Sequence, residues 1–205
     1  MTKEAWDELM GAFGIGEADQ MYEQFIRAYS EEHRFYHTLE HIEFMLKVLH
    51  RNRHSALYPK EVELAIIFHD IIYDVNSKTN ELQSAELAKE FLSSKDVDEE
   101  VVSRVFELIV STQHDSHLLD KDQQLLSDSD LAILGESPEK FDQYEAAIRQ
   151  EYSHVPDDQY RVGRLKVLNS FLRKPQIYHH QYFREVYEEK ARENLRRSIE
   201  GLDKI

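Results

Sequence analysis

The chain has 205 residues, with 40 acidic side chains, 25 lysines and arginines, 11 histidines and no cysteine, and its formal net charge is −15. This acidic balance disfavours a nucleic-acid-binding surface, because a duplex would be repelled. The lack of cysteine excludes disulfides, thiolate metal ligands and cysteine nucleophiles. There is no run of about 18 apolar residues and no signal-peptide pattern, so we expect a soluble cytoplasmic protein that does not enter a membrane.

Apolar residues recur at helical spacing along most of the chain. With only six glycines and four prolines, the chain has too few turn residues for a many-stranded β protein. In chain order, helices are predicted over residues 5–13, 18–29, 38–51, 59–73, 82–91, 101–110, 125–134, 138–152, 156–172 and 183–202. Polar loops are expected over 93–100 and 115–124. We therefore predict an all-α fold, a single helical-bundle domain over 1–205, with C-terminal helices 138–202 packing on a core of about 33–135.

The first chemically informative segment contains His37 and His41. The two are four residues apart, so on a helix they share a face, and that face continues through Met45. His41 is therefore expected to point inward. A buried histidine that bonds a backbone carbonyl is the alternative interpretation, because a core imidazole needs a partner.

The second segment is the pair His69 and Asp70, at the end of an apolar helix. His69 continues the face of Val62 and Ile66, and Asp70 lies about 100° around the helix axis. One side chain can then face a pocket while the other reaches it from the rim. An aspartate after an apolar run is otherwise a capping or solvated residue, so this pair alone is weak evidence.

Two more segments carry candidate ligands. Asp130 lies in an apolar stripe between Leu126 and Leu134, where a carboxylate is costly unless it is paired or metal-bound. Asp128 lies nearer the edge of that stripe and is the second choice. His114 continues the face of the preceding helix, and a histidine that ends a helix is an equally good interpretation of it.

Taken together, these segments supply imidazoles and carboxylates from several helices. That donor set suits Zn²⁺, Mn²⁺, Fe²⁺, Co²⁺ or Ni²⁺, with Mg²⁺ at a second position as an option. Because there are no thiolates, coordination positions filled by water are expected. The sequence therefore predicts a divalent metal site.

The order His … His-Asp … Asp on an all-helical chain resembles the HD superfamily of metal-dependent phosphohydrolases. The string from Tyr36 to His41 is similar to a segment of the cyclic-nucleotide phosphodiesterases. The strings 73–74, 79–81, 128–135 and 191–195 extend the likeness to a bacterial subfamily of predicted HD phosphohydrolases. One departure is that the phosphodiesterases carry another histidine soon after the His-Asp pair, where this chain has Asp74.

The resemblance implies that His41, His69, Asp70 and Asp130 hold the metal, with His114 as an extra ligand in a two-metal variant. It also implies that His37 protonates the leaving oxygen and that Asp70 takes part in catalysis. The expected substrate is a nucleotide or another small phosphorylated compound.

Phosphate groups need cations, and Arg34 and Lys78 are the predicted substrate-binding residues because both lie next to the motifs. For Arg164 and Arg192, on later helices, ion pairing is the better interpretation. Aromatic residues near the C-terminus are compatible with a homodimer.

Two other functions fit the same motifs. A di-iron oxygenase of the HD type would need His114 and Asp74 to join the ligands. A non-catalytic helical regulatory protein would keep the metal as a structural ion.

Overall fold

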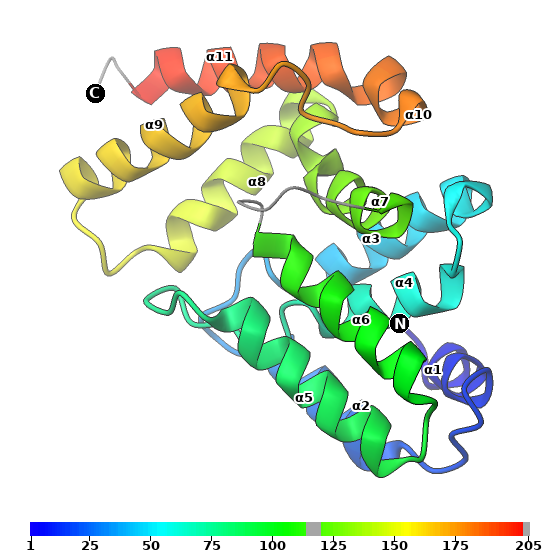
Figure 1. The fold of residues 1–205 in the computed structure, drawn as a ribbon. Coiled ribbons are helices and arrows are strands. Elements are labelled where there is room, and N and C mark those ends of the chain that lie inside the picture. The colour runs from blue at the N-terminus through cyan, green and yellow to red at the C-terminus, as the bar shows by residue number, and fades with distance from the viewer. Residues whose placement is uncertain (114–119, 203–205) are drawn as a thin grey trace. The chain divides into compact units, whose positions relative to one another are not determined.

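The computed structural model describes residues 1–113 and 120–202, and all of the regular structure in these ranges is helical (Figure 1). The predicted all-α fold is confirmed. Within the described ranges, no helix combines the length and the apolar character that crossing a bilayer requires.

The chain divides into two compact units, residues 1–129 and 130–205. The helices that begin in the first unit are α1 (Lys3–Gly11), α2 (Asp19–Ala28), α3 (Leu39–Asn52), η1 (Arg53–Ser55), α4 (Pro59–Phe68), α5 (Asn80–Ser94), α6 (Glu99–Val110), η2 (Ser111–Gln113) and α7 (Lys121–Leu131). Those of the second unit are η3 (Ala132–Gly135), α8 (Pro138–Glu151), α9 (Asp157–Arg173), α10 (Gln181–Phe183), the π-helical turn η4 (Arg184–Glu188) and α11 (Glu189–Leu202). The packing of the C-terminal helices on the core stays a prediction.

Helix α4 forms the centre of the first unit. It starts with Pro59 in its first turn, as predicted, and every residue from Val62 to Phe68 is buried. It packs against α3, α5 and α6, and Figure 1 shows α5 and α6 side by side. Because all its sides are covered, its apolar run is continuous rather than confined to one stripe.

The two acidic residues on α4 that are buried are both paired. Glu61 accepts hydrogen bonds of 2.7 and 2.8 Å from the guanidinium of Arg104 on α6. This carboxylate raises the pKa of Arg104, which also lies over the ring of Tyr58 at 4.3 Å. Glu63 accepts from Lys60 at 2.9 Å. The ion pair between Glu61 and Arg104 thereby ties α4 to α6.

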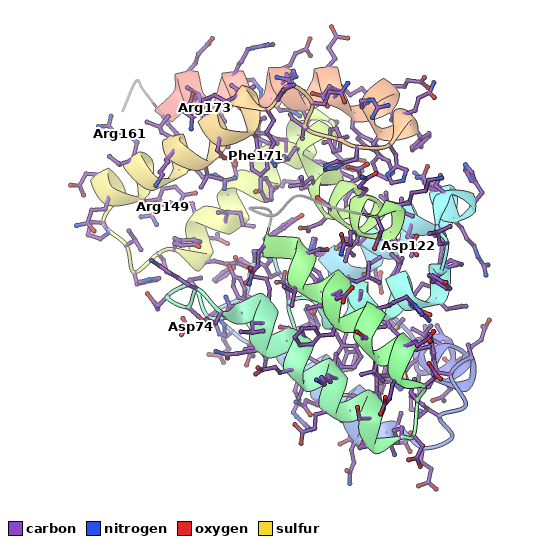
Figure 2. All side chains as sticks on the ribbon, in the orientation of Figure 1. Asp74, Asp122, Arg149, Arg161, Phe171 and Arg173 are labelled. Carbon is purple, nitrogen blue, oxygen red and sulfur yellow. The ribbon has the colours of Figure 1, made fainter. Side chains whose placement is uncertain are left out.

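The predicted loop over 115–124 is wrong at its C-terminal end, because α7 already begins at Lys121. Asp120 caps this helix, and its carboxylate accepts from the backbone nitrogens of Asp122 and Gln123 at 2.9 and 2.8 Å. The carboxylate of Asp122, labelled in Figure 2, accepts in turn from the backbone nitrogens of Leu57 and Tyr58. Asp120 and Asp122 therefore fix the start of α7, within a polar stretch that was predicted to be a loop.

In the second unit, η3 crosses the C-terminal helices at Gly135. A Cβ atom at this position would lie 2.6 Å from both the Cβ and the carbonyl oxygen of Tyr187. Asn194 of α11 secures the crossing by donating to the carbonyls of Leu134 and Glu136 at 2.9 and 3.0 Å. Gly135 is needed for this close approach, rather than for a helix-ending conformation with positive φ.

The substitution Gly135→Ala is expected to lower the free energy of unfolding by about 2–3 kcal/mol, because the new methyl group overlaps the backbone of Tyr187. Chemical denaturation measures this change. Gly163→Ala on α9 is the control, since its Cβ meets nothing within 4 Å, and it should stabilise by up to about 1 kcal/mol. Equal effects at both positions would contradict the proposed close crossing.

Candidate metal centre

The His-Asp pair lies where α4 stops. The helix was predicted to continue to residue 73, but it ends at Phe68, and His69 is its C-cap. Four side-chain contacts explain the early end. The Tyr29 hydroxyl donates to the carbonyl of Ile67 at 2.9 Å and accepts from the backbone nitrogen of Asp70 at 3.2 Å. Ser84 of α5 bonds both the nitrogen and the carbonyl of Ile72. These contacts satisfy backbone groups that a helix end leaves open.

Arg34 makes further contacts that hold the His-Asp turn in place. Its side chain is fully buried, and its guanidinium donates to the carbonyls of Asp70 at 2.6 Å and Ile71 at 3.2 Å, and to Glu31 at 2.9 Å. It also lies over the rings of Tyr29 and Tyr73. Arg34 was predicted to bind substrate; in the structure its donors are directed at Glu31 and at the backbone of the His-Asp turn.

His69 has a defined tautomer. Its Nδ1 atom lies 2.8 Å from the carbonyl oxygen of Ile66, which can only accept, so Nδ1 carries a hydrogen. Its Nε2 atom lies 3.1 Å from Oδ2 of Asp70. A lone pair and a carboxylate oxygen would then face each other unless a cation, either a second proton or a metal ion, neutralises the contact. Metal-binding histidines use this arrangement, in which the other ring nitrogen donates to a carbonyl.

His41 reaches the same place from the first turn of α3. It is buried, and its ring centroid lies 5.4 Å from that of His69. The ring of Tyr36 packs against it at 4.7 Å. The expectation that His41 points inward is therefore confirmed.

Asp130 completes the cluster. His41, His69 and Asp130 each offer one possible ligand atom, and these three atoms lie within 4.8 Å of one another. Asp130 lies in the last turn of α7, and residues 121–129 of this helix belong to the unit that holds both histidines.

The spacing fits a divalent ion. Bonds of about 2.1 Å place neighbouring ligand atoms about 3.0–3.4 Å apart and opposite ligand atoms about 4.2 Å apart. The 3.1 Å between His69 and Asp70 matches neighbouring ligands. The ligand atoms of His41, His69 and Asp130 all lie within 4.8 Å of one another, which is close to the separation of opposite ligands. His41, His69 and Asp130 therefore fit a metal ion with imidazole and carboxylate ligands, whereas Asp70, a fourth predicted ligand, contacts His69 but is not part of this three-residue cluster.

Asp128 and His114 are the remaining predicted ligands. Asp128, the second choice, lies on the same helix and is completely buried, whereas the three-residue cluster contains Asp130. His114 lies outside the described residues.

His37 lies beside the cluster, but it does not share a helix face with His41 as the sequence predicted. Helix α3 begins at Leu39 with Thr38 as its N-cap, so His37 precedes the helix and the four-residue spacing has no helical meaning. Its ring nevertheless lies 5.8 Å from that of His41, and its Nε2 atom lies 3.9 Å from Oδ2 of Asp70. The ring of Tyr73 packs on it at 4.3 Å. Its side chain is 19% exposed, so solvent and ligands can reach it.

The loop after the His-Asp turn holds the two other residues of interest. Lys78, a predicted substrate-binding residue, is exposed in this loop. Asp74 is also exposed, and its carboxylate accepts from the backbone nitrogen of Asn76 at 2.9 Å. Asp74 therefore organises the loop.

On the second unit, a buried network surrounds Tyr144 of α8. Arg164 donates to its hydroxyl oxygen at 2.9 Å and pairs with Glu145, as the ion-pair interpretation of Arg164 expected. Burial raises the pKa of Tyr144; Arg164 opposes this shift, while the charges of Glu145 and Asp130 add to it. Tyr144 therefore keeps its proton at neutral pH and can act as a hydrogen-bond donor.

Sequence reasoning missed Tyr29 and Ser84, which fix the His-Asp turn. Tyr29 is an aromatic residue at the end of an apolar stripe, and Ser84 stands among small helix-face residues. Neither position carries a local signal of this role, because their partners lie 41 and 12 residues away in sequence.

No family model matches this chain, and neither a curated protein nor a solved structure matches it.

The intact chain is expected to bind one divalent ion of the Zn²⁺ or Mn²⁺ type, and His41→Ala, His69→Ala or Asp130→Ala should each abolish this binding. A ligand present at 100 times its Kd stabilises the folded protein by about 2.7 kcal/mol, so a metal-dependent rise in Tm should disappear with it. Equilibrium dialysis with elemental analysis gives the stoichiometry. His50→Ala is the control, because this half-exposed histidine pairs with Glu63 instead. Unchanged binding in the three cluster variants would eliminate the site.

Proposed function

We propose that this protein is a metal-dependent phosphohydrolase of the HD type that acts on a nucleotide or another small phosphorylated compound. The observation that supports the proposal best is the convergence of His41, His69 and Asp130 within 4.8 Å, with Asp70 3.1 Å from His69. A purely structural ion would have no use for the partly exposed His37 next to Asp70.

The ligand residues would hold a divalent ion with two imidazoles and carboxylates. When bound, such an ion lowers the pKa of a coordinated water and neutralises phosphate charge. The backbone contacts of Arg34 keep Asp70 in place, so the carboxylate does not have to be reoriented when a ligand enters. The fixed Nδ1 hydrogen of His69 directs its other nitrogen to the ion.

His37 would handle the proton of the leaving group. An imidazole titrates near neutral pH, so it can hold a proton and deliver it to an alkoxide or phosphate oxygen. Its Nε2 atom lies 3.9 Å from Oδ2 of Asp70, which puts the imidazole at the edge of the cluster. The ring contact with Tyr73 limits how far His37 can turn.

With Arg34 committed to the backbone, Lys78 is the remaining predicted cation for the substrate. It lies in the exposed loop that follows the His-Asp turn. A flexible lysine in such a loop can approach a phosphate once the substrate is bound.

Purified protein supplied with Mn²⁺, Co²⁺, Ni²⁺, Zn²⁺, Fe²⁺ or Mg²⁺ is expected to release phosphate or a nucleoside monophosphate from at least one compound in a panel of nucleotides and sugar phosphates. Asp70→Asn should reduce this rate at least about a hundredfold, because it removes a ligand charge. Asp74→Asn is the matched control, a carboxylate four residues away that organises only the loop.

Each outcome separates the alternatives. Tight metal binding without cleavage of any compound would favour the regulatory protein with a structural ion. Two irons per chain with oxygen-dependent turnover would favour the oxygenase. Cleavage that survives in Asp70→Asn would point to a contaminating phosphatase.

The role of His37 predicts a dependence on the leaving group. His37→Ala should slow hydrolysis of an alkyl phosphate ester by about 100-fold or more, because an alkoxide needs a proton. The same variant should slow hydrolysis of a nitrophenyl ester less than about tenfold, since nitrophenolate leaves without one. His33→Ala is the control, as this half-exposed histidine contacts the carbonyl of Tyr73. Equal losses with both esters would assign His37 a positioning role.

A further inference from the structure

A cavity of about 540 Å³ lies within the second unit, and residues of α8, α9 and α11 line it. None of these lining residues belongs to the His-Asp cluster. Its volume is in the range of small-molecule sites, which extend from about 300 to 1,000 Å³. The cavity is therefore large enough for a ligand of its own.

Part of the lining is small or apolar. Ala146 comes from α8, Tyr160 from α9, and Gly201 and Leu202 from α11. A Cβ atom built on Gly201 meets no heavy atom within 4 Å, so the space beside this helix is open. This part of the cavity can accept the apolar body of a ligand.

The acidic residues that line the cavity are all paired. Asp142 accepts from Arg197 at 2.6 Å, and Asp157 accepts from Arg149 at 2.5 Å. Glu145 accepts from Ser198 at 2.7 Å and pairs with Arg164. These ion pairs neutralise Arg197 and Arg149 as well as Asp142 and Asp157.

Arg161 is the arginine that remains. It is partly exposed, and across residues 1–113 and 120–202 no ion pair or hydrogen bond to its guanidinium is found. Residues 159–184 contain no acidic residue, although the whole chain has a net charge of −15. Among the described residues, Arg161 therefore adds a guanidinium without a detected ion pair to a lining that otherwise holds three acidic residues and two arginines.

Tyr160, next to Arg161 in the lining, adds a neutral donor. Burial raises the pKa of its phenol to about 12, so it stays protonated at neutral pH. The guanidinium of Arg149 lies over its ring at 4.7 Å and holds it in place.

We propose that this cavity binds a small monocarboxylate with an apolar chain or ring. Arg161 holds the carboxylate, because a guanidinium matches its two oxygens. Ala146, Tyr160 and Leu202 contact the apolar body. The proposal is independent of the phosphohydrolase function, since the two sites share no residue.

Isothermal titration of the full-length protein with octanoate tests the proposal. Octanoate should bind saturably with a Kd of about 1 mM or tighter, a modest affinity for a ligand of this size. Octanamide, which keeps the chain but lacks the charge, and inorganic phosphate, which lacks the chain, should each bind at least about tenfold more weakly. Saturable binding of phosphate as tight as that of octanoate would refute the need for an apolar body.

Two arginines on α9 give a matched pair of variants (Figure 2). Arg161→Ala should weaken octanoate binding at least about tenfold, because it removes the charge-assisted hydrogen bonds. Arg173→Ala should leave binding unchanged, since Arg173 is exposed on the same helix but does not line the cavity.

Gly201→Leu gives a second, independent test, because it adds an apolar side chain to the lining at a position where a Cβ atom meets no heavy atom within 4 Å, and it changes no charge. It should abolish octanoate binding while circular dichroism and Tm show a folded protein. The proposal is overturned if octanoate does not bind, or if both Arg161→Ala and Gly201→Leu bind it like the unchanged protein.

Discussion

The arrangement of the candidate metal centre depends on a buried guanidinium at the end of α4. Arg34 donates to the carbonyls of Asp70 and Ile71, and its removal would leave both without these bonds in the interior. Burying an arginine is costly unless its donors are engaged, and here Glu31 and the rings of Tyr29 and Tyr73 share its charge. With this contact the helix stops at Phe68 and the chain turns, so that His69 and Asp70 point to the same region. A helix continued to residue 73 would have separated them around its axis.

The turn also brings together groups that repel each other unless a cation is present. His69 has its hydrogen on Nδ1, so its other nitrogen faces the Asp70 carboxylate at 3.1 Å. With a proton on Nε2 the two groups form an ion pair, and a metal ion would take the place of that proton. The binding of a metal ion and the stability of the first unit are therefore expected to be coupled.

Charge is distributed unevenly along the chain. Residues 130–205 contain 14 acidic and 13 basic side chains, so nearly all of the net charge of −15 belongs to residues 1–129. An acidic environment attracts divalent cations but repels phosphorylated substrates. A phosphohydrolase of this composition would rely on its metal ion to accept the anion. The nearly neutral second unit has no such constraint, which is consistent with a separate carboxylate-binding cavity around Arg161.

The sequence alone determined the helical class, most helix boundaries and the inward direction of His41, because these follow from apolar periodicity and local capping. Proline and serine signals located the starts of α4 and α8 correctly. The sequence also identified His69 and Asp130, since polar residues within apolar stripes stand out locally.

Only the tertiary structure decided the roles of the surrounding residues. Arg34 lies next to a motif and resembles a substrate ligand in sequence, but its partners are backbone carbonyls 36 and 37 residues away. His37 approaches Asp70 through a chain turn before α3 rather than along a helix face. The candidate cluster with His41 and His69 contains Asp130 and not Asp128. These relations arise from long-range packing, for which no local pattern of residues provides a signal.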